Sequence, residues 1–302
     1  MRKIISVLSL IIAVFLFTAC RTTAPEPEPN LSDIDIHVRE PSALVEIHPA
    51  DLLEVHFIDV GEGDAILITQ GTRAMLVDGG SAAMGMHVLA YLRNNGIEGL
   101  EYVVATHPFA DHVGGLPDIL RRMNVSNVLL PMVYQDTTAY NAFLLAVEES
   151  GAYVLVPFAG HVFNLGDALV TVLAPSPNDM WDNRANYSIV LQIEFGDTSF
   201  LLMGDAMREV EANLLDSTSH LSADVIKVAR HGSSSATTSG FLDAVNPSIA
   251  VISAGDDNSF LSQDVIRRLT NAGAHTFRTD LHGNIVISSD GTTLSVTVER
   301  YD

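Results

Sequence analysis

Cysteine is nearly absent from this chain, because Cys20 is the only one among 302 residues. A single thiol cannot form an intramolecular disulfide, so no covalent cross-link within the chain stabilises the fold. Hydrophobic residues make up 47% of the sequence and charged residues 18%. This composition is typical of a globular protein with a substantial packed core, and it argues against intrinsic disorder.

Basic residues are also scarce, with 16 Lys and Arg against 37 Asp and Glu, which gives a formal net charge of −21. A surface this acidic repels polyanions over long distances, so it excludes a broad nucleic-acid-binding face. The same charge leaves room for a local cationic pocket. We therefore expect any anionic partner to be a small substrate or a fragment of nucleic acid.

The apolar run near the start of the chain, Ile4–Phe17, is shorter than the roughly 20 residues that span a bilayer comfortably. It follows the basic pair Arg2-Lys3 and ends in Thr18-Ala19-Cys20, which is the layout of a secretory signal. The last residues resemble a bacterial lipobox. We predict a lipoprotein-type signal peptide over residues 1–19, a lipid on Cys20, and an extracytoplasmic protein anchored to the cell membrane. A plain signal peptide and an uncleaved anchor are the alternatives.

The segment from Cys20 to residue 51 has little apolar periodicity, and Pro-Glu repeats occupy Pro25–Pro29. Such a sequence predicts an extended tether that spaces a domain from a membrane. Removal of residues 1–19 takes away Arg2 and Lys3, so the net charge changes from −21 to −23. Ordered structure should begin near Leu52, and we predict one domain over residues 52–302.

Alternating apolar residues over Leu53–Val60, Ala65–Thr69 and Ala74–Val77, separated by Gly-containing turns, predict a β-meander at the start of this domain. Further strands and amphipathic helices follow without an internal repeat. The strands fall into two sets, with helices outside each set. This pattern predicts an α+β fold in which a sandwich of two mixed sheets lies between two helical layers.

Several polar side chains follow or adjoin apolar β runs, where a sandwich would present them along one rim. Two imidazoles and a carboxylate lie within six residues directly after the run Leu100–Ala105. Imidazole and carboxylate ligands suit Zn²⁺, and Mn²⁺ is the alternative where oxygen ligands dominate. A divalent metal activates water, so hydrolysis then needs no nucleophilic Ser or Cys. The candidate residues are His107, Asp111, His112, Asn186, Asp205 and His231.

Five segments resemble motifs of the metallo-β-lactamase superfamily, and in particular of its ComEC-like group. His107–Gly115 is similar to its metal-ligand signature, and Asp59–Ala65 is similar to the opening Asp-Val-Gly-Gln-Gly-Asp-Ala of that group. The other three segments are Asn186–Ser188, Leu202–Asp205 and Lys227–Ser233. The resemblance implies a four-layer αββα fold and a metal-dependent hydrolase.

Carried over by position, the resemblance implies a metal set of His107, Asp111, His112, Asp205 and His231. In this set His107 belongs to a first metal site, while Asp111, His112 and His231 belong to a second. Asp205 would bridge the two. The catalytic carboxylates would then be Asp111, which could orient the attacking water, and Asp205. Asn186 would line the first site.

Two substitutions depart from the family pattern. Phe109 stands where a metal-binding imidazole is usual, and Arg230 replaces the first His of the His-His-Gly-Ser segment. The first site is therefore a poor ligand set, and we predict one bound ion at the second. The Arg230 guanidinium could grip an anionic substrate in a bidentate manner. A salt bridge on a surface loop is the equal alternative.

These observations favour a hydrolase that cleaves a phosphodiester or a related anionic ester. The runner-up is a catalytically degenerate binding or scaffold lipoprotein with the same fold, because Phe109 and Arg230 weaken the metal centre. A β-lactamase proper is a third hypothesis. A serine hydrolase is disfavoured because Ser233–Ser235 lacks a Gly-x-Ser-x-Gly context. Asp78 could support the ligands from behind or cap a turn.

Overall fold

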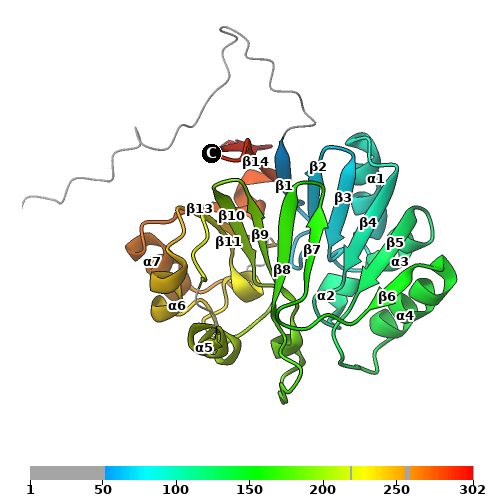
Figure 1. Ribbon diagram of the computed structural model, residues 1–302, viewed down its shortest axis with the longest axis horizontal. Helices are drawn as coiled ribbons and strands as arrows, with labels where there is room; N and C mark the ends of the chain where they lie inside the picture. Colours follow the sequence, from blue (N-terminus) through cyan, green and yellow to red (C-terminus); the bar gives the residue numbers. More distant parts are fainter. Residues whose placement is uncertain (1–51, 218–219, 256–258, 302) are drawn as a thin grey trace, which may run out of the picture. The chain divides into compact units, whose positions relative to one another are not determined.

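Two β-sheets packed face to face form the centre of the domain in the computed structural model, which describes residues 52–217, 220–255 and 259–301 (Figure 1). The first sheet has eight strands in the order β15-β14-β1-β2-β3-β4-β5-β6. Its strands are β1 Leu53–Phe57, β2 Ile66–Gln70, β3 Arg73–Val77, β4 Gly99–Val104, β5 Asn124–Leu129, β6 Tyr153–Leu155, β14 Ile285–Ser289 and β15 Leu294–Val298.

The predicted meander is confirmed, because β1 pairs antiparallel with β2, and β2 with β3. Strands β4, β5 and β6 then add in parallel to the edge at β3. The two last strands of the chain return to the other side of this sheet, where β14 pairs antiparallel with β1. The first sheet is therefore mixed, and it joins the two ends of the domain sequence.

The second sheet has seven strands in the order β13-β12-β11-β10-β9-β8-β7. The pairs from β7 to β10 are antiparallel, and those from β10 to β13 are parallel. This sheet is also mixed, as expected, although β7 was not among the predicted strands. Its strands are β7 Val162–Leu165, β8 Ala168–Ala174, β9 Val190–Phe195, β10 Thr198–Leu202, β11 Val225–Lys227, β12 Ile249–Ile252 and β13 His275–Arg278.

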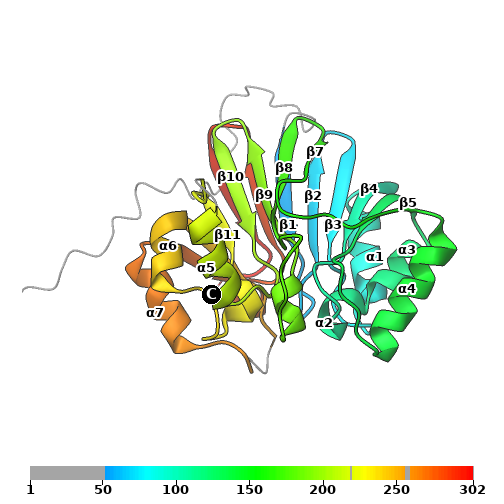
Figure 2. The same cartoon turned by 60° about the horizontal axis from the view of Figure 1, so that its bottom comes forward.

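Helices cover the outer face of each sheet (Figures 1 and 2). The first sheet is covered by α1 Gly85–Asn94, α3 Leu116–Leu120 and α4 Thr138–Ser150, and the second by α5 Arg208–Ser217, α6 Ser239–Val245 and α7 Gln263–Asn271. Short turns of helix are α2 Ala110–Val113, α8 Thr279–His282 and the 3-10 turns η3 Arg184–Tyr187 and η4 Ala229–Gly232. Within the described ranges, no helix is both long and apolar enough to cross a membrane.

Alternation along the strands explains why both faces of each sheet are buried. In β2, Ile66 and Ile68 face the core between the sheets, while Leu67 faces the helices. In β10, Phe200 and Leu202 face the same central core, and Leu201 packs toward α5 and α6. Successive side chains of a strand point to opposite faces, so each sheet needs a helical layer outside it. The result is the predicted four-layer αββα sandwich.

The signal peptide, the lipidated Cys20 and the Pro/Glu-rich tether fall in residues 1–51, outside the described part of the chain. Those expectations stay predictions.

A close backbone contact joins the turn after β1 to the segment that carries Asp111. Gly63 has φ +114°, and a Cβ at this position would lie 2.1 Å from the backbone oxygen of Asp111. Gly61, two residues earlier, also has a positive φ of +72°, but a Cβ there would meet nothing within 4 Å. Both positions need a left-handed backbone, and only Gly63 also needs the missing side chain.

We expect Gly63→Ala to destabilise the domain more than Gly61→Ala does. Both changes strain a positive φ, which costs about 1 kcal/mol, but the new methyl at Gly63 also overpacks against Asp111, which adds roughly 1–3 kcal/mol. Urea unfolding followed by circular dichroism measures the difference. Equal losses for the two variants would contradict the close contact.

Candidate metal centre

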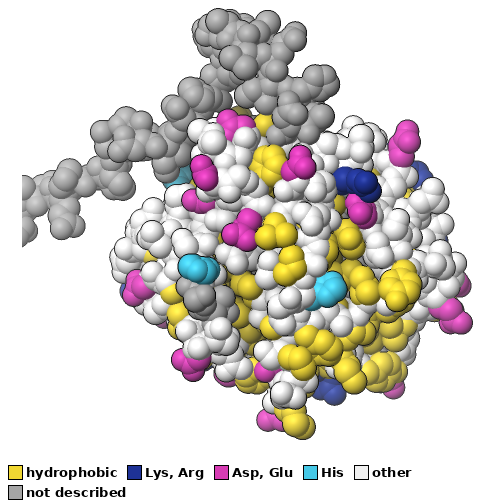
Figure 3. Space-filling model, viewed as in Figure 1, with side chains coloured by type: hydrophobic (Ala, Val, Ile, Leu, Met, Phe, Trp, Pro, Cys, Tyr) yellow, Lys and Arg dark blue, Asp and Glu magenta, His cyan; other side chains and the backbone are white. Residues whose placement is uncertain are grey.

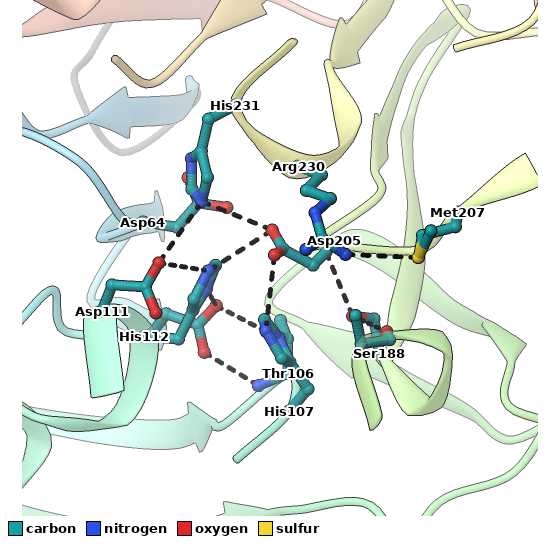
Figure 4. Close-up of polar contacts among 12 residues, drawn as sticks. Asp64, Thr106, His107, Asp111, His112, Ser188, Asp205, Met207, Arg230 and His231 are labelled. Atoms are coloured by element: carbon teal, nitrogen blue, oxygen red, sulfur yellow. Dashed lines mark hydrogen bonds and ion pairs between the residues drawn. The ribbon is translucent and has the colours of Figure 1, made fainter. Parts of the chain in front are cut away.

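The candidate site lies where strands of both sheets end. β3 and β4 are parallel neighbours in the first sheet, and Asp78 and His107 follow their carboxyl ends. β10 and β11 are parallel neighbours in the second sheet, and Asp205 and His231 follow theirs. Carboxyl ends of parallel strands meet at one edge of a sheet, so two such edges create a shared polar rim. Figure 4 shows these side chains directed toward one another.

Four of the five predicted metal ligands converge on one point. The Nε2 atoms of His112 and His231 each lie 3.4 Å from Oδ1 of Asp205. The same two nitrogen atoms each lie 3.7 Å from Oδ2 of Asp111. Tetrahedral ligands at the usual Zn–N and Zn–O distances are separated from one another by about 3.3–3.6 Å. The spacing therefore suits a single divalent ion.

Most of the nitrogen and oxygen atoms that meet at this point form no hydrogen bond with the described residues. Nε2 of His112, Nε2 of His231 and Oδ1 of Asp205 are buried and have no hydrogen-bond partner among the described residues. Buried polar atoms are normally bonded, and leaving one unbonded costs about 1–3 kcal/mol. Three such atoms facing one point, together with a carboxylate from Asp111, are a donor set that fits a metal ion.

His107 faces the other oxygen of Asp205. Its Nε2 atom lies 3.6 Å from Oδ2 of Asp205, and it too is buried without a hydrogen-bond partner among the described residues. Asp205 thus presents one oxygen to His112 and His231 and the second oxygen to His107. This placement corresponds to the bridging position that the resemblance implied.

Apart from His112, whose ligand atom lies within 4.8 Å of those of His107 and Asp205, the contacts of Phe109 and Asn186 offer no further ligand beside His107. The Phe109 ring packs against the His107 ring in a T-shaped arrangement, with centroids 4.7 Å apart. Asn186 lies nearby, but its Oδ1 accepts a hydrogen bond from the Met207 N–H at 3.0 Å, and its Nδ2 donates to Glu209 at 3.3 Å. The first site therefore keeps an imidazole and a carboxylate oxygen, and Asn186 fixes the start of α5.

Arg230 reaches from η4 toward Asp205 and Met207 (Figure 4). Its Nη1 donates to the Met207 Sδ at 3.2 Å, and the guanidinium carbon lies 5.8 Å from the centre of the Phe260 ring. Within the described residues it forms no ion pair with a carboxylate. Because sulfur is a weak acceptor, most of its donors remain available for an anion.

Two residues position His112 from behind. Oδ2 of Asp78 lies 2.8 Å from Nδ1 of His112, and the same carboxylate accepts hydrogen bonds from the Thr106 N–H and hydroxyl at 2.8 and 2.6 Å. A carboxylate on Nδ1 fixes the ring so that Nε2 faces the centre. Of the two roles considered for Asp78, the contacts show support of a ligand.

A buried ion pair that sequence reasoning missed stands behind His231. The Lys227 ammonium lies 2.8 and 2.9 Å from the two oxygens of Asp64, and both side chains are almost fully buried. Nδ1 of His231 lies 3.8 Å from Asp64. The signal was present in the sequence, because Lys227 interrupts an apolar strand and Asp64 directly precedes another.

The electrostatics of the cluster favour a positive charge at its centre. Burial lowers the pKa of His107 to about 3, with help from His112, so this imidazole is neutral. Burial also opposes charge on His112, but the carboxylates of Asp205 and Asp78 outweigh it and raise the His112 pKa well above its usual value. Burial opposes the ionised Asp111, yet His231 and His112 lower its pKa to about 2. A cation at the centre would satisfy these carboxylates in place of a proton.

The backbone is also unusual at this rim. Asp78, Arg230 and His231 have φ values of 58°, 47° and 52°. A left-handed conformation costs a residue other than glycine about 1–3 kcal/mol, and the surrounding structure must hold it in place. The strain is concentrated in residues that position or form the centre.

Comparison with known proteins identifies the family. The pattern of the metallo-beta-lactamase superfamily matches residues 58–256, and the chain belongs to this superfamily. ComE operon protein 3 of Bacillus subtilis is 30% identical over 200 residues, which cover 66% of this chain and 26% of that protein. Recombination protein 2 of Haemophilus influenzae is 27% identical over 223 residues, covering 72% and 26%. The chain spans about a quarter of the length of these relatives.

Solved structures agree on the fold. The metallo-beta-lactamase fold protein YhfI from Bacillus subtilis has a TM-score of 0.54 at 12% identity, covering 78% of this chain and all of that protein. CmlA, a diiron beta-hydroxylase from Streptomyces venezuelae, has a TM-score of 0.52 at 16% identity, covering 78% and 53%. The predicted family and fold class are confirmed. A hydroxylase on the same fold also shows that the fold alone does not determine the reaction.

The Asp64–Lys227 pair makes a testable contribution to stability. We expect Lys227→Met to lower the free energy of unfolding by about 3–5 kcal/mol, because it leaves a buried carboxylate uncompensated. The double change Asp64→Asn with Lys227→Met should recover much of this loss, since no buried charge remains. Urea unfolding of the two variants provides the comparison. A double variant no more stable than the single one would show that the pair contributes by packing and not by charge.

Proposed function

We propose that this chain is a metal-dependent hydrolase whose centre is formed by Asp111, His112, Asp205 and His231. The observation that carries the proposal is the convergence of three otherwise unbonded, buried atoms and an Asp111 oxygen, with nitrogen–oxygen distances of 3.4–3.7 Å. The number of complete ligand sets favours one ion, with Zn²⁺ as the first expectation and Mn²⁺ as the alternative. When bound, such an ion lowers the pKa of water and polarises a phosphoryl oxygen.

Asp111, Asp205 and His107 have different roles in the proposed reaction. Asp111 is the most exposed of the four, with 32% of its side chain accessible, and it stays ionised because its pKa lies near 2. Its second carboxylate oxygen can accept a hydrogen bond from water that approaches from solvent, and so orient that water toward the ester. Asp205 is buried and ionised, and its role is to hold the centre. His107 supplies a neutral ring beside it.

The substrate class that we propose is a phosphodiester or a related anionic ester. Arg230 supports it, because its guanidinium pairs with no carboxylate in the part of the chain that the structure describes, and a guanidinium matches the paired oxygens of a phosphate. Two similar proteins are Recombination protein 2 of Haemophilus influenzae and Competence protein ComA of Neisseria gonorrhoeae, and their names refer to recombination and competence, which involve nucleic acid. Acidic side chains are scattered over the face seen in Figure 3 and basic ones are few, which disfavours a long duplex. A small anionic ester or a short nucleic-acid fragment is consistent with both the names of the relatives and the acidic surface.

We also propose that the hydrolase acts outside the cytoplasm, held at the cell membrane by a lipid on Cys20. The support is in the sequence, where a basic start, an apolar run and a lipobox-like join precede a Pro/Glu-rich tether. A tether of this kind would let the domain reach small substrates near the membrane surface.

A catalytically degenerate binding or scaffold protein is the second candidate. The observation that favours it is the Phe109 ring, which packs on His107 where a further ligand would have to stand. In this alternative the polar cluster persists for packing, and metal ions bind only weakly and without specificity.

Metal removal separates the two candidates. We expect a chelator to abolish hydrolysis of bis(p-nitrophenyl) phosphate, and Zn²⁺ or Mn²⁺ to restore it with about one ion per chain. Asp78→Asn should weaken metal affinity by about 10–100-fold, because the hydrogen bond that orients His112 is impaired. Calorimetric titration measures the affinity.

The matched controls for this experiment are His112→Ala and His87→Ala. His87 is an exposed imidazole on α1, so its loss should leave metal binding unchanged, whereas loss of His112 should abolish it. Should the purified chain hold no divalent ion and regain no turnover with any, the hydrolase proposal fails.

Restoring the usual imidazoles tests the first site. In the variant Phe109→His with Arg230→His, the introduced rings join His107 and Oδ2 of Asp205, so we expect metal content to rise from one ion to two. Activity should rise by less than about tenfold if the native centre is specialised for one ion. A far larger rise would mean that the native centre is impaired, which supports the degenerate alternative.

A further inference from the structure

Positive charge also gathers in a surface pocket beside the metal centre. The pocket has a volume of about 620 Å³, and it lies between the start of α5, the loop after η4 and helix α7. We call it the arginine pocket after Arg208, Arg267 and Arg268, which line it together with Ser234 and Thr238. Figure 2 shows α5, α6 and α7 grouped on the same side of the second sheet. Its volume lies within the range of about 300–1,000 Å³ typical of ligand pockets.

The charge of this pocket is opposite to that of the molecule. The chain has 16 basic residues and a net charge of −21, yet three of the 16 line this one pocket. The pocket lining contains one carboxylate, Asp264, which pairs with Arg267. The lining itself thus has three guanidinium groups against one carboxylate, and the buried Glu211 carboxylate behind it accepts hydrogen bonds from Thr238 and interacts with Arg268. In a strongly acidic protein, such a patch attracts anions that the rest of the surface repels.

Backbone carbonyls hold two of the guanidinium groups in fixed positions. Arg208 donates from Nη2 to the Ser234 oxygen at 2.8 Å and from Nε to the Ser235 oxygen at 3.2 Å. Arg268 donates from Nη1 to the oxygens of Ala236 and Thr237 at 3.0 and 2.6 Å. Each guanidinium carries five N–H donors, so both keep donors that these bonds do not use. A preorganised group loses less entropy when it binds an anion.

The same two loops lead from the metal centre to the arginine pocket. Arg208 follows Asp205 by three residues, and Ser234 follows His231 by three residues. The Arg208 N–H donates to the Ser235 oxygen at 3.1 Å, which ties the two loops together. One wall therefore carries a ligand of the centre at one end and a pocket arginine at the other.

We propose that the arginine pocket binds a phosphate group of the substrate other than the one that is hydrolysed. This inference rests on the proposed function and narrows its substrate class to a chain with more than one phosphate, such as a short oligonucleotide. A substrate that spans both places would meet Arg230 at the reacting phosphate and Arg208, Arg267 and Arg268 at a neighbouring one. A single small ester would use the metal centre alone.

The test uses Arg267→Gln, because Arg267 is exposed and, among the described residues, its side chain pairs with Asp264 on its own helix. Its matched control is Arg122→Gln, an exposed arginine that pairs with Asp118 on the other side of the fold. We expect Arg267→Gln to raise KM for hexathymidylate about fivefold and to leave kcat unchanged. The slope of log affinity against log salt should fall by about 0.7, the value for one lost contact to a single strand. Kinetics with bis(p-nitrophenyl) phosphate should not change.

A binding measurement without hydrolysis distinguishes the arginine-pocket proposal from the hydrolase proposal. Fluorescence anisotropy of labelled hexathymidylate, recorded with a chelator present, reports the pocket whether or not the chain hydrolyses esters. Weaker binding in Arg267→Gln and Arg208→Gln but not in Arg122→Gln supports the pocket even if hydrolysis is never observed. Equal behaviour of the Arg267 and Arg122 variants, or equal effects on both substrates, overturns it.

Discussion

Negative charge buried at the rim between the sheets constrains the rest of the domain. Asp64, Asp78 and Asp205 are all at most 3% exposed, and an uncompensated carboxylate in such a place costs several kcal/mol. Lys227 of the second sheet compensates Asp64 of the first, and His112 compensates Asp78. The Lys227–Asp64 contact crosses from the second sheet to the first, so it helps to fix how the sheets meet, whereas His112 and Asp78 both follow strands of the first sheet. The same contacts place the imidazoles around Asp205.

Much of the fold could be predicted from the sequence, because it depends on local pattern. Alternation of apolar residues located β1 to β3, and the grouping of strands and helices indicated two sheets between two helical layers. Pairing between distant strands could not be predicted in this way. The pairing of β14 with β1 joins residues more than two hundred positions apart, and the sequence of neither strand indicates which strand it pairs with. β7 was missed because Val162–Leu165 is a short edge strand with half its residues exposed.

The ligand set was accessible from the sequence, but the supporting contacts were not. Motif resemblance predicted the candidate ligands His107, Asp111, His112, Asp205 and His231. The structure brings the three imidazoles around the two oxygens of Asp205, and Asp111 lies against His112 and His231. Asp64 and Lys227 each lie in one of the recognised motifs, Asp59–Ala65 and Lys227–Ser233. They are 163 positions apart in the sequence, and only the fold shows that they pair. The direction in which a side chain points cannot be predicted from the sequence either. The sequence showed that Arg230 replaces an imidazole, and the structure was needed to show that it has no carboxylate partner within the described residues.

Because Asp205 has two carboxylate oxygens, Phe109 can occupy the position of an imidazole without disturbing the contacts of His112 and His231. Phe109 contacts the His107 ring, which faces Oδ2, while His112 and His231 face Oδ1. Loss of a ligand on the Oδ2 side removes donors from one site without moving those of the other, because Asp78 holds His112 from behind and His231 is buried beside Asp64. His107 remains buried and neutral beside the aromatic ring, which requires no counter-charge. A change of side chain beside Oδ2 therefore leaves the contacts of His112 and His231 with Oδ1 of Asp205 in place.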